Sequence, residues 1–306
     1  MPVEFKNRVA IVTGAGGGLG RSHAIELARR GVKVVVNDLG GDVRGEGGSM
    51  AMADQVVAEI EALGGEAVAD GANVTRAGEV RAMVDTAISK WGKVDILVNN
   101  AGILRDRSFS KMEMSDFRLV TDVHMIGTAV CTRAVWNHMR ENRFGRIVVT
   151  TSSSGMYGNF GQANYSAAKA GVVGFMNTLC LEGAKYDIRV NALSPIAGTR
   201  MTKGLFPEEA LDLFPVESVS AGLVYLVCDD APNRTILCAG GGSYAATRIY
   251  ETNGIYLLPQ DRTAENVAGH WDAILDPAGQ GEHDSSGHQS MKFAARAQNH
   301  MAPKNK

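Results

Sequence analysis

Tyr165 and Lys169 stand four positions apart in a stretch with a helical pattern, so their side chains share one face. A free tyrosine has a pKa of about 10, which is too high for a general base near neutrality. A neighbouring ammonium favours the phenolate, and the tyrosine can then take a proton from a substrate hydroxyl or return it. The spacing predicts acid–base chemistry, although the same spacing alone also occurs on ordinary helix surfaces.

Ser152 lies 13 positions before Tyr165, at the end of an expected strand. There its hydroxyl can donate a hydrogen bond to the substrate oxygen and stabilise the charge that develops on it. A serine, a tyrosine and a lysine at these positions predict a site that interconverts a secondary alcohol and a ketone.

A glycine-rich loop, TGAGGGLG from Thr13 to Gly20, separates an apolar β-branched run from a helical pattern. Glycines let the backbone turn sharply and approach a pyrophosphate, whose charge meets the free N–H groups of the next helix. Such a loop alone is weak evidence, but here it has the strand–loop–helix context that dinucleotide binding needs. We expect cofactor contacts at Gly14, Gly18 and Gly20.

Asp38 ends the second expected strand, 18 positions after Gly20. A carboxylate there can accept hydrogen bonds from both hydroxyls of an adenosine ribose, and it repels the 2′-phosphate of NADP. Neither Ala15–Gly17 nor Leu39 supplies a basic residue to counter that repulsion. The sequence therefore predicts NAD as the cofactor, and an aspartate that merely caps a turn is the alternative.

The elements that would position these residues alternate along the chain. Helical patterns separate apolar strand runs near residues 9–13, 32–38, 67–69, 95–99, 146–151 and 189–194. This alternation predicts an α/β fold, a single doubly wound parallel sheet of the Rossmann kind, over residues 1–245. The turn Asn99–Gly102, NNAG, closes the fourth strand, where small residues would let the chain pass under a cofactor ribose.

Residues 246–306 differ in character and are expected to form a C-terminal extension outside the catalytic sheet. Polar and apolar residues alternate around Asn253-Gly254, which predicts a type I′ hairpin. The stretch Asp276–Ser290 is polar and glycine-rich, which predicts a mobile tail.

Composition argues against several classes of function. The chain of 306 residues has a formal net charge of −2 and no basic block, so nucleic-acid and membrane-surface partners have no electrostatic footprint. No apolar stretch approaches the ~20 residues of a membrane span, and the N-terminus lacks a signal-peptide pattern. The four cysteines show neither metal-site nor disulfide spacing. We therefore expect a cytoplasmic protein without a metal.

Together, TGAGGGLG, NNAG and Ser152 followed by Tyr165-Ser-Ala-Ala-Lys169 resemble the short-chain dehydrogenase/reductase superfamily, over residues 8 to about 245. The segments VVVNDLGGD, NNAGILRDRSF and SGMYGNFGQANYSAAKAG resemble, more specifically, the (3R)-hydroxyacyl-CoA dehydrogenase unit of peroxisomal multifunctional enzymes of type two. The closer resemblance is dense over the first 200 residues and thin beyond about 245.

The resemblance implies further contacts with NAD. Leu19 and Asp38 would hold its adenosine half, and Asn100 would lie by the ribose. Asn73 and Val74 would flank the adenine, and Tyr165 and Lys169 would bind the nicotinamide ribose. Ile196 to Thr199 would contact the carboxamide. Most of the superfamily has Pro-Gly where this chain has Pro195-Ile196, so the carboxamide contact departs from the common pattern.

His124 marks a second departure. Many members of the superfamily place an asparagine there, which supports a proton-relay water, whereas the multifunctional enzymes also carry a histidine. His124 is therefore a candidate catalytic residue for the relay, and a hydrogen-bonded helix residue is the alternative.

For the substrate, the resemblance implies a 3-hydroxyacyl-CoA. A free secondary alcohol or ketone, steroid or aromatic, is the alternative, and a non-catalytic NAD-binding sensor is a remote alternative from another class. The apolar loop Met201–Val216 is expected to cover the substrate, with help from the segment after residue 245. Arg44 and Arg248 are candidate partners for CoA phosphates, with a solvated loop arginine as the alternative for each.

The resemblance also implies a homodimer or homotetramer that packs through two long helices. One of these helices carries the small residues that close approach would need, at Ala167, Ala168, Ala170, Gly171 and Gly174. Close packing of the same helix on its own sheet would explain them equally well.

Overall fold

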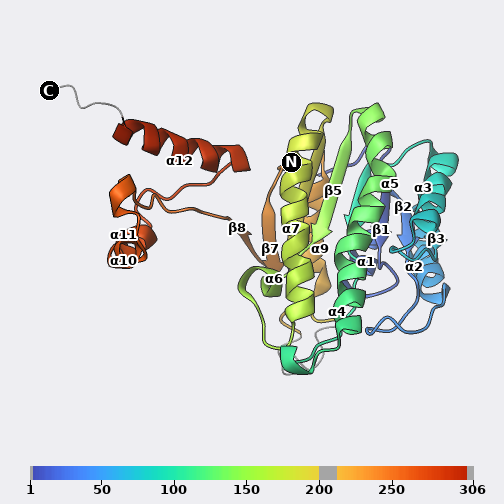
Figure 1. Cartoon of the computed structure of the whole chain (residues 1–306). Helices are drawn as coiled ribbons and strands as arrows, with labels where there is room; N and C mark the ends of the chain where they lie inside the picture. The colour runs from blue at the N-terminus through green and yellow to red at the C-terminus, as the bar shows by residue number, and fades with distance from the viewer. Residues whose placement is uncertain (1–2, 200–211, 302–306) are drawn as a thin grey trace. The chain divides into compact units, whose positions relative to one another are not determined.

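The structure, a computed structural model, describes residues 3–199 and 212–301 of the chain. Its centre is an eight-stranded sheet made of β1 Val9–Thr13, β2 Lys33–Asn37, β3 Ala67–Asp70, β4 Ile96–Asn99, β5 Gly145–Thr150, β6 Ile188–Pro195, β7 Ile236–Gly240 and β8 Ser243–Thr247. The spatial order is β3-β2-β1-β4-β5-β6-β7-β8 (Figure 1). Strands β1 to β7 run parallel and β8 runs antiparallel to β7. The predicted α/β fold with a doubly wound parallel sheet is confirmed.

Helices cover both faces of the sheet because its central strands are apolar on both faces. Strands β1 and β4 read VAIVT and ILVN, and all their residues are buried, as is typical of parallel sheets. One face packs against α1 Gly18–Ala28, α2 Ala51–Ala62 and α9 Val216–Val227, and the other against α3 Ala77–Trp91, α5 Gly127–Asn142 and α7 Ala163–Gly183. Within the described residues, no helix is long and apolar enough to cross a membrane.

The strand order reverses at β1, because the chain runs outward from β1 to β3 and then returns to β4 on the other side of β1. At such a switch point the connecting loops diverge and leave a crevice at the carboxyl ends of the strands. The glycine loop follows β1, NNAG closes β4, and Ser152 follows β5. The predicted cofactor and catalytic segments therefore share one edge of the sheet.

A residue with a left-handed backbone precedes each of the seven parallel strands. Gly31, Gly64 and Gly92 hold this position before β2, β3 and β4, with φ of 82°, 81° and 79°. Non-glycine residues with φ between 50° and 62° hold it before β1, β5, β6 and β7, namely Asn7, Arg143, Asp187 and Arg234. A left-handed residue reverses the chain in one step, which keeps the turns into the strands short.

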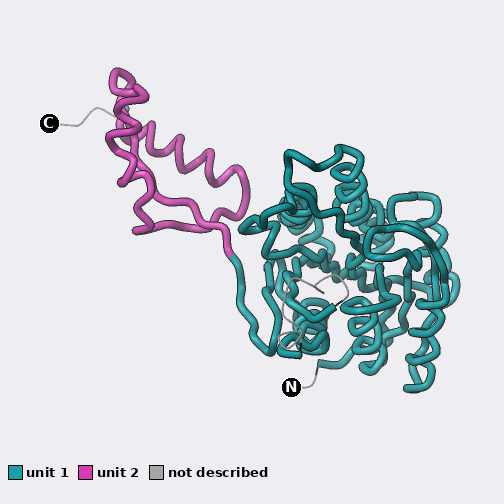
Figure 2. Tube along the Cα trace, turned by 90° about the horizontal axis from the view of Figure 1, so that it is seen from below, with its two compact units in different colours: residues 1–247 teal, residues 248–306 magenta. Residues whose placement is uncertain are grey.

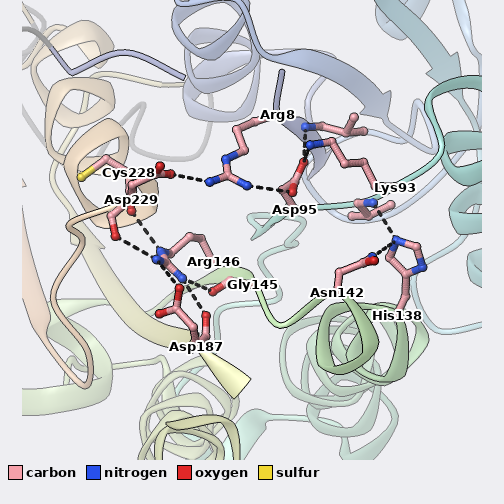
Figure 3. Close-up of polar contacts among 12 residues, drawn as sticks. Arg8, Lys93, Asp95, His138, Asn142, Gly145, Arg146, Asp187, Cys228 and Asp229 are labelled. Atoms are coloured by element: carbon pink, nitrogen blue, oxygen red, sulfur yellow. Dashed lines mark hydrogen bonds and ion pairs between the residues drawn. The ribbon is translucent and has the colours of Figure 1, made fainter. Parts of the chain in front are cut away.

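Arg146 occupies the amino end of the sheet, opposite the predicted site (Figure 3). It lies on β5, its side chain is only 1% exposed, and all five of its N–H groups are hydrogen-bonded. One bond of 3.2 Å reaches the carboxylate of Asp187. The others, of 2.7 to 3.0 Å, reach the carbonyl oxygens of Gly145, Asp187, Cys228 and Asp229.

Arg8, just before β1, extends this cluster. Its guanidinium pairs with Asp95 at 3.2 Å and with Asp229 at 2.8 Å. The guanidinium groups of Arg8 and Arg146 also lie over the Phe144 ring, 3.5 and 4.1 Å from its centre. Two arginines thus join the starts of β1, β4, β5 and β6 to the end of α9.

The hairpin predicted at Asn253-Gly254 is wrong, because the residues on either side of it form no paired strands. The sheet instead ends in a hairpin between β7 and β8, in which Gly240 pairs with Ser243. Its two turn residues, Gly241 and Gly242, have φ of 56° and 75°. A type I′ turn requires positive φ at both positions, and two glycines satisfy this.

The stretch Asp276–Ser290, predicted as a mobile tail, overlaps with α12 Ser286–Met301, so its last residues are helical. Residues 248–306 form a second compact unit (Figure 2), with α10 Ala264–Gly269 and α11 Trp271–Leu275. Lys292 of α12 donates to Glu251 at 2.8 Å and to the carbonyl oxygen of Thr252 at 2.6 Å. These contacts anchor a helix whose serine- and glycine-rich start suggested disorder.

Candidate active site

Tyr165 and Lys169 lie on the first two turns of α7. The Lys169 side chain is buried, and its Nζ donates to the carbonyl oxygen of Thr150, the last residue of β5, at 2.5 Å. The Oγ1 of Thr151 donates to the carbonyl oxygen of Lys169 at 2.8 Å. Both bonds hold the start of α7 against the end of β5, with Lys169 Nζ 5.6 Å from the centre of the Tyr165 ring.

Ser152 follows β5 and caps the short helix α6 Ser153–Tyr157. Its Oγ accepts a hydrogen bond from the backbone N–H of Ser154 at 3.2 Å, and its side chain is hydrogen-bonded to Tyr165. The structure thus brings Ser152, Tyr165 and Lys169 together at the carboxyl end of β5. A substrate oxygen placed there could contact the serine and tyrosine hydroxyls at once.

The charges in this trio differ from the expectation that Lys169 lowers the pKa of Tyr165. Burial lowers the pKa of Lys169 to about 7, so its ammonium is only partly populated near neutrality. Burial raises the pKa of Tyr165, and the hydrogen bond from Ser152 lowers it by less. The protein alone therefore favours a neutral phenol, because desolvation acts on both members of the pair.

His124 lies beside Tyr165, in a π-helical turn, Asp122–Ile126, between α4 Met114–Thr121 and α5. The two rings meet edge to face, with centres 5.1 Å apart. His124 Nε2 lies 2.8 Å from the carbonyl oxygen of Ile103, while Nδ1 is buried without a hydrogen-bond partner among the described residues. Burial, and then the charge of Lys169, lower the pKa of His124 well below its usual value, so the ring is neutral.

Gly102 of the NNAG turn makes room for that ring. A Cβ at Gly102 would lie 2.3 Å from His124 Cε1, so another residue there would displace the imidazole. The turn that bounds the cofactor side thus also places His124 against Tyr165.

Most of the predicted cofactor residues line one cavity at the switch point. They are Gly14, Gly18, Leu19, Gly20, Asp38, Asn73, Val74, Asn100 and Thr199. Ile196 does not line this cavity; it is 40% exposed, and its backbone N–H donates to the carbonyl oxygen of Ala239 at 2.8 Å. The cavity therefore gathers the residues expected at the adenosine half, with Asn100 and Thr199. Tyr165 and Lys169, which were expected at the nicotinamide ribose, do not line it either.

The glycine loop is held close to the NNAG turn. Gly14 has φ of 63°, and a Cβ there would lie 2.8 Å from Ala101 Cα. At Gly20 a Cβ would lie 2.1 Å from the carbonyl oxygen of Gly14. Asn100 Nδ2 donates to the carbonyl oxygens of Thr13 and Gly14, both at 3.0 Å. Larger residues at either glycine would break this packing.

The Asp38 carboxylate is oriented by two backbone N–H groups, from Gly16 and Gly40, each at 2.7 Å. Both of these bonds come from loops that border the cavity. A carboxylate at the strand end and a glycine turn before α1 suit the ribose and the pyrophosphate of a dinucleotide. The residues present therefore fit a nicotinamide dinucleotide.

The sequence analysis placed Arg44, in the loop after Asp38, near the substrate but did not predict that this loop lines the cofactor cavity. Gly41, Asp42, Val43 and Gly45 line the cavity. The loop is hydrogen-bonded to the segment after β4, where Leu104 N–H donates to the carbonyl oxygen of Val43 at 2.9 Å. The glycines signalled a loop, but no residue pattern signalled that it folds back onto residues 103–105.

Metal-binding groups do not cluster in the described part of the chain, since no three His, Cys, Asp or Glu side chains are placed to share an ion.

The loop residues 200–211, which include most of the stretch expected to cover the substrate, lie outside the described residues.

The family model for short chain dehydrogenases matches residues 8–210. The peroxisomal multifunctional enzyme type 2 of Mus musculus is 46% identical over 279 residues, which cover 90% of this chain and 37% of the mouse protein. This chain therefore spans little more than a third of that relative.

Two solved structures resemble the fold. Full-length peroxisomal multifunctional enzyme type 2 from Drosophila melanogaster matches with a TM-score of 0.81 and 33% identity, over 97% of this chain and 50% of that one. A 7α-hydroxysteroid dehydrogenase, complexed with NADH and 7-oxo glycochenodeoxycholic acid, matches with a TM-score of 0.71 and 30% identity. The match to the steroid enzyme covers 79% of this chain and 96% of that one.

Proposed function

The chain belongs to the short-chain dehydrogenase family, oxidoreductases that act on a CH–OH group, and on that premise we propose that it interconverts a 3-hydroxyacyl-CoA and its 3-oxoacyl partner with NAD. The observation that carries the choice of substrate is the likeness to multifunctional enzymes of type two over 90% of this chain. The cluster of Ser152, Tyr165 and Lys169 beside the dinucleotide cavity supports the reaction type.

Each member of the trio has a defined part in this proposal. Ser152 donates a hydrogen bond to the substrate oxygen, and Tyr165 takes the proton of the substrate hydroxyl in oxidation and returns it in reduction. NAD, when bound, supplies the hydride acceptor and a positive charge. Lys169 holds its Nζ near Tyr165, where its cationic form favours the phenolate.

His124 takes the place of the asparagine that supports a relay water in many relatives. Its neutral ring packs on Tyr165, and its buried Nδ1 has no partner among the described residues. Nε2 lies 3.1 Å from the backbone nitrogen and 2.8 Å from the carbonyl oxygen of Ile103, so Nδ1 is an acceptor in one tautomer and a donor in the other. In either tautomer Nδ1 could form a hydrogen bond with a water, which would extend a proton path from the active site.

The preference for NAD rests on Asp38. Its carboxylate accepts hydrogen bonds from Gly16 and Gly40, and a carboxylate at this strand end can accept from ribose hydroxyls and repel a 2′-phosphate. The NADH in the similar steroid dehydrogenase is in keeping with this choice.

For assembly we propose a homodimer or homotetramer through α5 and α7. Ala167, Ala170 and Gly174 are exposed on α7, whereas Ala168 is buried against the chain's own sheet. Light scattering of the purified protein would give its oligomeric state, and a monomer would contradict the proposal.

A cytoplasmic location stays a prediction, and the mouse relative has the word peroxisomal in its name.

A free secondary alcohol, such as a steroid, is the second candidate substrate. The observation that favours it is the likeness to a structure that holds a 7-oxo bile acid conjugate. Its match covers less of this chain than the multifunctional enzyme does, so we place it second.

The test is to follow NADH at steady state with 3-hydroxyacyl-CoA substrates and with free secondary alcohols, steroids included. We expect kcat/KM to be highest for an acyl-CoA. Higher values for a free alcohol would favour the second candidate. NADH binding without turnover of any substrate would favour a sensor.

A further inference from the structure

A second cavity, of about 250 Å³, opens beside the active site. It lies between the loop after Asp38 and the segment after β4, and its walls are strongly charged. The lining residues are Arg44, Arg105, Asp106, Arg107, Ser108, Lys111 and Asp116.

The carboxylates of this cavity are already engaged. Asp106 accepts a hydrogen bond from Gln162 at 2.7 Å, and Asp116 pairs with Arg105 at 3.4 Å. Arg105 also pairs with Glu46 at 3.2 Å, so its charge is balanced within the protein.

Three positively charged side chains of this cavity differ from Arg105. The side chains of Arg44, Arg107 and Lys111 form no hydrogen bond or ion pair with the described residues, although the charge of Arg44 helps to lower the pKa of nearby Asp42. These three residues are exposed, so water screens their mutual repulsion, and an anion bound among them would gain favourable interactions with all three charges. Guanidinium groups are especially suited to phosphate, which they can bind through two N–H groups at once.

The cavity is built onto the same helix that carries Tyr165. Three hydrogen bonds join its wall to the segment just before the tyrosine: Arg107 N–H to the carbonyl oxygen of Gly161 at 2.8 Å, Gln162 to Asp106, and Asn164 Nδ2 to the carbonyl oxygen of Arg105 at 3.0 Å. The wall of this cavity is therefore tied to the segment that leads into Tyr165.

The cavity is separate from the cofactor cavity. Val43 and Gly45 line the cofactor cavity, whereas Arg44, between them, lines the second one. Arg44 therefore belongs to the wall of the second cavity and not to that of the cofactor cavity.

We propose that this second cavity binds the phosphate groups of the CoA nucleotide of the substrate, through Arg44, Arg107 and Lys111. The proposal rests on the proposed function, since it gives the anionic part of a long thioester its own site. Contacts far from the reacting carbon can supply binding energy that positions the acyl chain.

The experiment compares two substrates with the same 3-oxoacyl group, one on CoA and one on pantetheine, which lacks the phosphates. The variants are Arg44→Gln, Arg107→Gln, Lys111→Gln and the triple substitution, with Arg81→Gln, an exposed arginine on α3, as the control. We expect the triple variant to raise KM for the CoA substrate by about tenfold or more, which is about 1.4 kcal/mol, with kcat nearly unchanged. The KM for the pantetheine substrate and both constants of the control should stay at wild-type values.

A binding measurement keeps the proposal testable apart from turnover. Adenosine 3′,5′-bisphosphate should bind the NADH-loaded wild type without displacing NADH, and the triple variant should lose this binding. Displacement of NADH, or equal binding by the triple variant, would overturn the proposal.

The possible failures are distinguishable. Equal KM values for the two wild-type thioester substrates would overturn the phosphate site and leave the thioester function standing. Turnover of free alcohols but of neither thioester would overturn the proposed function as well. A large preference for an acyl chain on an acidic carrier protein, lost in the triple variant, would reassign the cations to protein docking and overturn the CoA site.

Discussion

The two ends of the sheet differ in how many of their buried polar groups have hydrogen-bond partners. At the amino end, all five N–H groups of Arg146 are hydrogen-bonded, and the one unpaired atom of this cluster is Arg8 Nε, in an arginine that lies over an aromatic ring. At the carboxyl end, buried polar atoms without partners in the described structure gather around the candidate site. They are Asn99 Oδ1, His124 Nδ1, Thr150 Oγ1 and Ser166 Oγ.

Buried polar groups cost free energy unless they are paired, so the difference has a physical meaning. At the amino end, groups of the chain itself pair with the buried polar groups, and these contacts hold the strands together. The carboxyl end keeps unpaired groups and a lysine with a lowered pKa, which are suited to a water, a cofactor or a substrate. Stability and chemistry are thus separated along the strands, and substitutions at the two ends should have opposite signatures.

The largest expected effect is that of Tyr165→Phe at the carboxyl end. Loss of the phenolic oxygen should lower kcat by about 10³-fold, within the range of general acid–base catalysis, while the melting temperature hardly changes. Steady-state rates and thermal unfolding measure both, and Tyr225→Phe, on the exposed side of α9, is the control. Wild-type turnover in the Tyr165 variant would show that the chemistry lies elsewhere.

Arg146→Met should show the reverse pattern. Removal of the guanidinium leaves carbonyl oxygens and a carboxylate without their donor, so the free energy of unfolding should fall by about 3 kcal/mol. The kcat of the folded protein at 25 °C should stay within about twofold. Denaturant unfolding provides the measurement, with Arg81→Met, at an exposed position of α3, expected within about 0.5 kcal/mol of wild type. A stable Arg146 variant with poor turnover would contradict the separation of the two ends.

Asp38→Ala tests the cofactor half of the carboxyl end. Loss of a charged hydrogen bond of about 1.5–3 kcal/mol should lower kcat/KM with NAD about tenfold or more, and use of NADP should improve relative to NAD. Asp38→Asn is the matched variant, because it removes the charge while it keeps one acceptor oxygen for either Gly16 or Gly40. The interpretation fails if the wild type already uses NADP as well as NAD.

Lys169 makes the stability of the cofactor-free protein depend on pH. Its pKa is about 7 when folded and near 10.5 when unfolded, so between these values the unfolded chain binds the extra proton and stability rises with pH. The slope approaches about 1 kcal/mol per unit from pH 7 to 9. Above pH 9 the raised pKa values of Cys131 and Cys180, about 12 and 11, act in the opposite direction.

Thermal unfolding from pH 7 to 9 should therefore show the rise in the wild type and in Lys6→Met, an exposed lysine. Lys169→Met should remove most of it. An unchanged slope in the Lys169 variant would mean that the lysine keeps an ordinary pKa in the folded protein.

The sheet and the catalytic trio could be predicted because their signals are local. The strand runs are continuous and apolar, and the spacing from Ser152 to Tyr165 and Lys169 places all three at one strand end once the alternation of elements is known. Asp38 follows from the same alternation.

The parts that escaped prediction depend on contacts between distant segments. The loop after Asp38 lines the cofactor cavity because it pairs with Leu104, more than sixty positions after Val43, and no local pattern encodes that. The pKa of Lys169 depends on burial, which a spacing rule does not contain. The hairpin was misplaced because Asn253-Gly254 and Gly241-Gly242 both suit a two-residue turn, and the strands that pair with each other flank the second.

The left-handed residues before the strands bear on how this protein could tolerate change. Arg143 holds a conformation that costs an ordinary residue about 1–2 kcal/mol, and glycine there would avoid the cost at some expense in chain entropy. Arg143→Gly should therefore act as a second-site suppressor, which restores the abundance of destabilised variants without touching turnover. Stability gained at the amino end of the sheet could then offset the destabilising effect of substitutions that change specificity at the carboxyl end.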